Sequence, residues 1–171
     1  IGKNSDTPIE SALDDYLLCL DKVYKLADYV AINISSPNTK NLRELQSKDY
    51  IDKLLLSIRD RQLALASTDG YTPILIKISP DMNMEELKFL SQSVLENNLD
   101  GIICSNTTTQ HSHFSEGGGL SGKPLFDSST LTLELLRNLV GKEFPIIASG
   151  GVMGLDSFQK KIDKGANLVQ I

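Results

Sequence analysis

The chain alternates short apolar runs with longer segments in which apolar residues recur at helical spacing. Five apolar runs, each four to six residues long, carry almost no polar alternation. Continuous runs of this length are typical of strands in a parallel sheet whose two faces are both covered. We therefore predict strands at residues 29–34, 74–78, 101–104, 145–148 and 168–171.

Helical periodicity occupies the segments before and between these runs. Thr7 and Glu10 have the spacing of a capping box with Pro8 at the first helical position, and Asn83 and Glu86 repeat that spacing before the third helix. Gly165 is placed to end the fifth helix. The second and fourth helices are expected to begin near residues 47 and 129. The predicted buried faces are Leu13, Leu17, Leu20, Val23 and Ala27; Ile51, Leu54, Leu55 and Ile58; Leu87, Leu90 and Val94; Leu131, Leu135 and Leu139; and Leu155, Phe158 and Ile162.

This alternation of helices and strands favours a parallel sheet built from right-handed crossovers. A doubly wound sheet and a segment of a (β/α)8 barrel both fit the pattern. A complete barrel takes about 250 residues and eight strands, so five strands could form only part of one. No linker, repeat or low-complexity stretch divides the 171 residues, which we interpret as one domain or part of one.

Composition and charge narrow the class of protein. The net charge is −5, from 22 acidic and 17 basic residues, and the lysines are scattered, so no nucleic-acid partner is expected. No apolar run approaches the roughly 20 residues of a membrane-spanning helix, and the first ten residues do not resemble a signal peptide. Cys19 and Cys104 fit reduced core residues, and His111 and His113 lack partners for a metal site. No metal is expected.

Polar and glycine-rich segments follow the predicted strands, at the edge where parallel α/β folds build active sites. They lie at residues 33–39, 77–81, 105–108, 117–124 and 149–151. Each sequence alone is common in structural turns. Together, the asparagines, a lysine in an apolar strand and two glycine-rich loops favour a site for a planar heterocycle with many hydrogen-bonding atoms.

The first of these two glycine-rich loops, residues 117–124, only partly matches a P-loop. Gly117, Gly122 and Lys123 have the required spacing, but Pro124 stands where the magnesium-binding Ser or Thr belongs, and no apolar strand precedes the loop. Glycine-rich backbone can nevertheless bind phosphate without that motif.

The order and spacing of five motifs, NISSPNT at 33–39, KISPD at 77–81, NTT at 106–108, GGLSGKPL at 118–125 and SGG at 149–151, resemble those of class 2 (quinone-dependent) dihydroorotate dehydrogenases. The resemblance covers essentially the whole chain. It implies a (β/α)8 TIM barrel, covered here from about the end of strand 3 through strand 8, with residues 1–171 forming a partial FMN-binding barrel domain. The implied activity is FMN-dependent oxidation of (S)-dihydroorotate to orotate in pyrimidine biosynthesis, with quinone as the electron acceptor.

The resemblance also implies roles for individual residues. Ser36 corresponds to the catalytic base, and Thr39 to the threonine that helps to carry the proton away. The substrate-binding set is Asn33, Asn38, Asn106 and Thr107. The cofactor-binding set is Asn33, Lys77, Ser105, Ser121, Gly122, Gly150 and Gly151. Ser105 stands where threonine is usual in the family, Ser149 replaces a common valine, and the stretch between residues 109 and 117 is short.

The family further implies segments that this sequence does not contain. The first barrel strands, the N-terminal extension that meets quinone, and a C-terminal phosphate segment are expected outside residues 1–171. The fragment alone is therefore expected to be inactive, with unpaired sheet edges at both ends. The whole protein is expected to associate peripherally with the cytoplasmic face of a bacterial inner membrane, or alternatively with a mitochondrial inner membrane.

Two other functions remain open at this stage. A class 1 or dihydropyrimidine-type FMN barrel would keep the flavin and change the electron acceptor, although Ser36 argues against it because class 1 members usually carry cysteine there. In a non-catalytic, ligand-binding barrel fragment, the polar residues at the strand ends would only form hydrogen bonds with one another.

Overall fold

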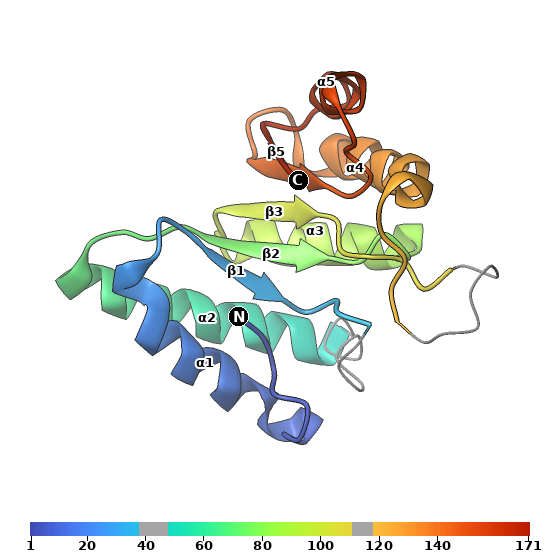
Figure 1. The fold of residues 1–171 in the computed structure, drawn as a ribbon. Helices are drawn as coiled ribbons and strands as arrows, with labels where there is room; N and C mark the ends of the chain where they lie inside the picture. Colours follow the sequence, from blue (N-terminus) through green and yellow to red (C-terminus); the bar gives the residue numbers. More distant parts are fainter. Residues whose placement is uncertain (38–47, 111–117) are drawn as a thin grey trace.

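The computed structural model describes residues 1–37, 48–110 and 118–171. Strands and helices alternate along the chain, as predicted (Figure 1). The strands are β1 (Val30–Asn33), β2 (Ile74–Ile78), β3 (Gly101–Cys104), β4 (Ile146–Ser149) and β5 (Leu168–Gln170). The helices are α1 (Ala12–Val23), α2 (Lys48–Asp69), α3 (Met84–Glu96), α4 (Phe126–Val140) and α5 (Leu155–Asp163), with short 3-10 turns η1 (Ile9–Ser11), η2 (Tyr24–Leu26) and η4 (Lys123–Leu125).

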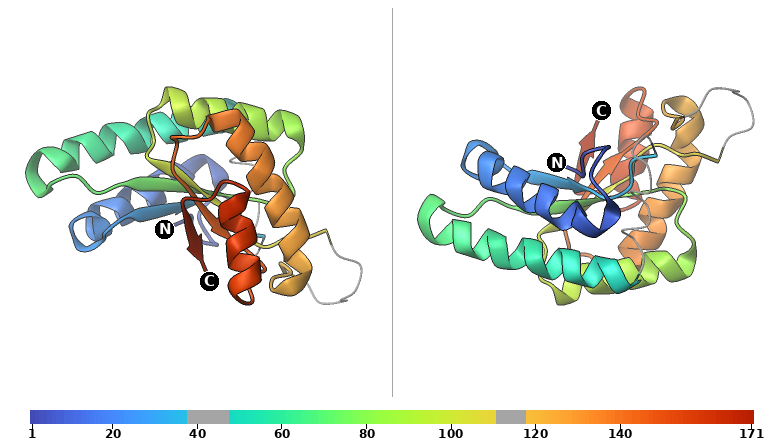
Figure 2. Two further views of the ribbon diagram at one scale, coloured as in Figure 1. Left: turned by 90° about the horizontal axis from the view of Figure 1, so that it is seen from above. Right: turned by 90° about the horizontal axis from the view of Figure 1, so that it is seen from below.

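The strands form one parallel sheet in the order β1-β2-β3-β4-β5. A doubly wound sheet would reverse its strand order at a switch point, whereas here each strand pairs with the next one along the chain. Consecutive helices from α1 to α5 also contact one another and follow one side of the sheet (Figure 2). This arrangement is that of a barrel wall with its outer layer of helices.

The two faces of the sheet differ because successive strand residues point to opposite sides. Ile76 and Ile102, with their even-numbered neighbours, pack into the main core against the helices. Leu75, Ile103 and Ile147 form a small separate cluster on the other face. By the same alternation, Asn33 and Lys77 point to this second face, and the β1–β2 register places them side by side. The inner face of the wall therefore carries apolar residues along the strands and polar residues at their carboxyl ends.

Two local predictions are confirmed, the capping box of α3 and the glycine that ends α5. Asn83 accepts hydrogen bonds from the backbone of Glu85 and Glu86, and Glu86 bonds back to the Asn83 N–H, which completes the capping box of α3. Gly165 follows α5 with φ +104° and donates its N–H to the Ile162 carbonyl.

The prediction for the start of the first helix is wrong. Pro8 precedes the 3-10 turn, no side chain caps that turn, and α1 begins only at Ala12. Thr7 instead hydrogen-bonds Asp15. The buried stripe of α1 is Ala12, Tyr16 and Leu20, while the predicted Leu13 and Leu17 are half-buried. The fourth helix likewise begins at Phe126, before the predicted residue 129, because it continues directly from η4.

The predicted buried face of the fifth helix is wrong at Leu155 and Phe158, whereas Ile162 packs against the main core as expected. Leu155 is 78% exposed and Phe158 is 39% exposed, whereas Lys161 is fully buried. Apolar spacing alone could not identify this, because a long lysine stem can pack as hydrocarbon.

The expectation of an open edge at β1 is corrected in part. The Ile1 amino group donates to the Ala31 carbonyl at 2.7 Å, and the Asn33 N–H donates to the Ile1 carbonyl at 2.9 Å. The first residue of the chain thus covers part of that edge.

Candidate active site

A cavity of about 260 Å³ lies at the carboxyl ends of the strands. Its walls combine strand ends with the glycine-rich loops that follow them. The predicted residues among its lining are Lys77, Ser105, Asn106, Thr107, Ser121, Gly122, Gly150 and Gly151. Sequence positions from 77 to 151 therefore meet around one space.

A hydrogen-bond network links the ends of β1, β2 and β3 beside this cavity. Asn106 Nδ2 donates to Asn33 Oδ1 and to Ser35 Oγ, both at 3.1 Å. Ser35 Oγ, which is fully buried, donates to the Lys77 carbonyl at 2.7 Å. Asn106 Oδ1 in turn accepts the Thr107 N–H at 2.9 Å. These contacts hold both asparagine side chains in fixed orientations, as the recognition of a planar ligand requires.

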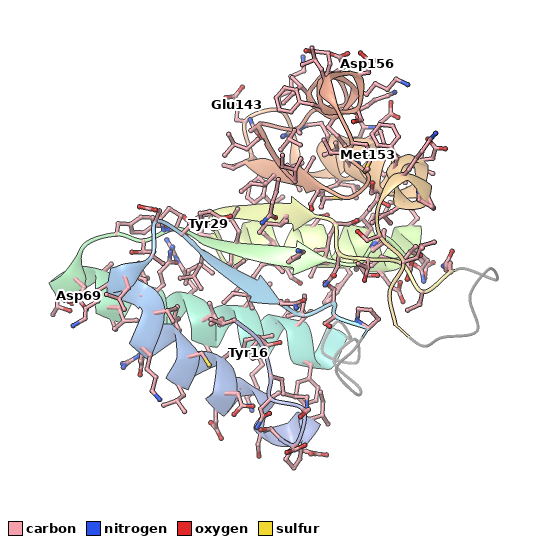
Figure 3. All side chains as sticks on the ribbon, in the orientation of Figure 1. Tyr16, Tyr29, Asp69, Glu143, Met153 and Asp156 are labelled. Atoms are coloured by element: carbon pink, nitrogen blue, oxygen red, sulfur yellow. The ribbon has the colours of Figure 1, made fainter. Side chains whose placement is uncertain are left out.

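Tyr16 stabilises the end of β1 that carries Asn33. Its side chain lies between α1 and β1, and its hydroxyl donates to the Asn33 carbonyl at 2.7 Å (Figure 3). Burial raises the pKa of Tyr16, so the hydroxyl remains a proton donor throughout the ordinary pH range.

Asp81 anchors the loop that carries Asn106 and Thr107. Its carboxylate accepts hydrogen bonds from the Thr108 hydroxyl and from the Thr109 N–H, the latter at 2.8 Å. Thr108 also exchanges two backbone hydrogen bonds with Leu120, which joins this loop to the next one.

The second loop approaches the first very closely at Gly119. A Cβ at this position would overlap the side chain of Thr107 and come to 2.8 Å from Pro37 Cγ. Only glycine therefore allows the loop carrying Ser121 to lie against both neighbours.

The glycines at the other end of the cavity adopt left-handed backbone conformations, with φ +69° at Gly122, +100° at Gly150 and +76° at Gly151. At Gly151 a Cβ would lie 2.5 Å from Phe126 Cα, so this turn packs directly on the first residue of α4. Glycine-rich turns of this kind, next to a helix N-terminus, present backbone N–H groups to an anion. The loops suit a phosphate group, and Lys77 provides a cation in the wall of the same cavity.

Not every predicted site residue falls within this description. Ser36 is half buried and directly follows Ser35, but it does not line the cavity. Asn38, Thr39, His111 and His113 lie outside the described residues. Among residues 1–37, 48–110 and 118–171, no group of three or more His, Cys, Asp or Glu side chains could hold a metal ion. In the same part of the chain no helix is long and apolar enough to cross a membrane.

Sequence reasoning missed the supporting residues Tyr16, Ser35 and Asp81. Ser35 and Asp81 stand inside the recognised motifs, which marked the segments without indicating what these two side chains contact. Tyr16 gave no signal, because its partner is a backbone carbonyl 17 residues away.

Comparison with known proteins gives a consistent result. A sequence model of the family described as "Dihydroorotate dehydrogenase" matches residues 1–171. "Dihydroorotate dehydrogenase (quinone)" of Idiomarina loihiensis is 49% identical over 100% of the chain and 53% of its own length, and the protein of the same name from Paraburkholderia phymatum is 47% identical over 100% and 52%.

Solved structures agree with the sequence relatives. The crystal structure of DHODH from Eimeria tenella in complex with ferulenol has a TM-score of 0.91 and 34% identity, and covers 100% of the chain and 50% of its own. The ligand-free type of the same enzyme has a TM-score of 0.90. The chain thus spans about half the length of the relatives it matches, and its fold is part of a (β/α)8 barrel.

Proposed function

The chain belongs to the dihydroorotate dehydrogenase family, and from that premise we propose that it forms the cofactor- and substrate-binding half of an FMN-dependent enzyme that oxidises (S)-dihydroorotate to orotate and passes the electrons to a quinone. The observation that carries this proposal is the meeting of Lys77, Asn106 and the Gly150–Gly151 turn around one cavity. A cation, a fixed amide and a phosphate-type turn are the groups that a flavin with a bound pyrimidine would need.

Asn33, Asn106 and Thr107 are proposed to hold the pyrimidine, together with Asn38. Asn33 and Asn106 are already oriented by each other and by Ser35, so little side-chain freedom would be lost on binding. Such preorganised amides favour one orientation of the substrate ring. In the wrong orientation, carbonyl or N–H groups would be left without hydrogen-bond partners, which is unfavourable.

Lys77 and the loops are proposed to bind the cofactor. Ser121, Gly122, Gly150 and Gly151 would surround its ribityl-phosphate end, and Lys77 would lie at the edge of its ring. Ser105 would also contact the cofactor. FMN, when bound, supplies the acceptor for the hydride that leaves C6 of dihydroorotate. A fixed ammonium in a water-poor site favours the negative charge that then develops.

Ser36 is proposed as the base that removes the proton from C5 of the substrate. A serine hydroxyl is a weak base at its ordinary pKa and needs an onward acceptor for the proton. Thr39 or a water molecule would be that acceptor. We extend the proposal to a peripheral location on the cytoplasmic face of a bacterial inner membrane, or on a mitochondrial inner membrane, with the quinone meeting a region outside residues 1–171.

Dihydroorotate-dependent reduction of a soluble quinone by the complete protein that contains this chain tests the proposal. Fumarate and NAD⁺ serve as alternative acceptors in parallel reactions. We expect turnover with quinone as the electron acceptor and none with fumarate or NAD⁺. Turnover with either alternative would indicate a different class of flavin barrel, and a protein that purifies without flavin and fails to bind added FMN would contradict the proposal.

A further inference from the structure

Lys161 is a fully buried ammonium group on α5, directly behind the wall of the cavity. Its Nζ donates to Ser129 Oγ on α4 at 2.6 Å and lies 5.1 Å from the centre of the Phe126 ring. Burial lowers its pKa to about 8, so most of the group is protonated near neutral pH. Cys104 and Lys160 are the titratable neighbours. Burial raises the pKa of the Cys104 thiol to about 12, and Lys160 is exposed, with its Nζ 5.9 Å from the centre of the Phe126 ring.

This arrangement is costly for stability. A buried charge normally has an ionic partner, because the desolvation of an ammonium group is unfavourable. Within the described residues, no carboxylate pairs with Lys161, and its partners are one neutral hydroxyl and one aromatic ring. An apolar side chain would serve the packing alone at least as well.

The Ser129 hydroxyl, which accepts the hydrogen bond from Lys161, also contacts the glycine turn. Ser129 Oγ has a single hydrogen, and its acceptors are the Gly150 carbonyl at 3.0 Å and the Phe126 carbonyl at 3.1 Å. Lys161 cannot accept this hydrogen, because an ammonium group has no lone pair, so Ser129 donates it to one of the two carbonyls. When Gly150 accepts, its carbonyl is held towards α4.

The direction of that carbonyl fixes the next N–H. In a trans peptide unit the carbonyl and the following N–H point in opposite directions. The Gly151 N–H therefore points away from Ser129, on a turn that lines the cavity. Lys161 thus acts on the turn in two ways: it orients a backbone donor, and it places a positive charge behind it.

We propose that Lys161 is a positioning residue for the phosphate of the cofactor, acting through Ser129 on the Gly150–Gly151 turn. The inference rests on the proposed FMN site. The counter-charge of the buried ammonium would then be the phosphate dianion, which the Gly150–Gly151 turn would hold.

The test compares FMN with riboflavin, which lacks only the phosphate. Affinities of both flavins for the flavin-stripped complete protein are measured near neutral pH by flavin fluorescence, in the wild type and in Lys161→Met. Lys160→Met is the matched control, because it removes the neighbouring exposed lysine whose Nζ lies near the same Phe126 ring. Lys161→Arg keeps the charge.

We expect Lys161→Met to lower the preference for FMN over riboflavin by about tenfold, the scale of one partly screened charge interaction. Riboflavin affinity should be unchanged, Lys160→Met should match the wild type, and Lys161→Arg should retain most of the preference. A proportional loss of both flavins, or no loss of either, would overturn the positioning role. Failure of the wild type to bind either flavin would instead contradict the proposed function.

Discussion

Ser36 is the residue on which the proposed chemistry depends most. We predict that Ser36→Ala leaves FMN bound but lowers dihydroorotate oxidation by roughly 10²-fold or more, the scale expected for loss of a positioned base. Ser36→Cys should keep part of the activity, with its pH optimum moved towards the titration of the thiol. The comparison uses steady-state kinetics with Ser67→Ala, an exposed serine of α2, as the control. Near-normal turnover of Ser36→Ala would remove this serine from the mechanism.

The prediction for Lys77 is about binding and reduction of the flavin rather than binding of the pyrimidine. It lies on the inner face of β2 beside Asn33, in the wall of the cavity. Lys77→Ala should weaken flavin retention and lower the reduction potential of the flavin that remains, because a fixed cation favours the reduced, anionic ring. Orotate affinity should change less.

A redox titration of the purified protein decides the role of Lys77. Lys142→Ala, which removes an exposed lysine between α4 and β4, is the control for the general loss of a positive charge. An unchanged midpoint potential with full flavin occupancy in Lys77→Ala would contradict the assignment.

Lys161 should also affect stability in a pH-dependent way. Its pKa falls from an ordinary value of 10.5 to about 8 in the folded protein, which corresponds to about 3 kcal/mol against folding when the group is protonated in both states. Between those two pH values the unfolded chain binds more protons than the folded chain. Stability therefore rises with pH across this window, and the penalty is fully present below it.

The flavin-free Lys161→Met variant should lack this rise. It should be more stable than the wild type near neutral pH by about 1–3 kcal/mol, because replacing a buried charge by a hydrocarbon of similar size is often stabilising. Denaturant unfolding at several pH values measures the effect, with Lys160→Met as control. A variant that is less stable than the wild type near neutral pH would show that the ammonium group itself holds α4 and α5 together.

At the scale of single elements, the strands were the most predictable part of the molecule. β2 and β3 have the expected limits, and the other strands differ from expectation by one or two residues, because buried parallel strands leave short uninterrupted apolar runs. Helix faces were less predictable. The pattern in α5 placed Leu155 inside and could not identify Lys161, since periodicity counts apolar residues and does not register a buried charged residue whose Nζ lies over an aromatic ring.

The turn after β4 provides a prediction at this scale. Gly151→Ala combines a positive φ with a Cβ 2.5 Å from Phe126 Cα, so the turn or α4 must shift. Gly141→Ala is the matched control, with φ +81° and no atom within 4 Å of the added Cβ. We expect the control to cost about 1 kcal/mol from backbone strain alone, and Gly151→Ala to cost more and to weaken FMN binding.

Denaturant unfolding and flavin fluorescence measure the two effects in these glycine variants. Equal losses of stability in both, with FMN affinity unchanged, would mean that the close contact between the turn and α4 is not required for the cofactor site.

For the whole molecule, the order of the strands and the motifs at their ends predicted the fold and the location of the site. The sequence could not predict how the site is held together. The bonds from Asn106 to Asn33 and Ser35 join residues more than 70 positions apart, and no local pattern encodes such contacts. No local pattern encodes the hydrogen bonds from Thr108 and Thr109 to Asp81 either. These bonds fix the loop that carries Asn106.

The most direct test of the account is an anaerobic titration of the complete, purified protein with dihydroorotate, followed through the visible absorbance of its flavin. In the absence of any electron acceptor, the substrate should bleach the flavin stoichiometrically and yield one orotate for each flavin reduced. Addition of quinone should then restore the oxidised spectrum. A bound flavin that stays oxidised in the presence of excess dihydroorotate would contradict the assignment of this cavity to dihydroorotate oxidation.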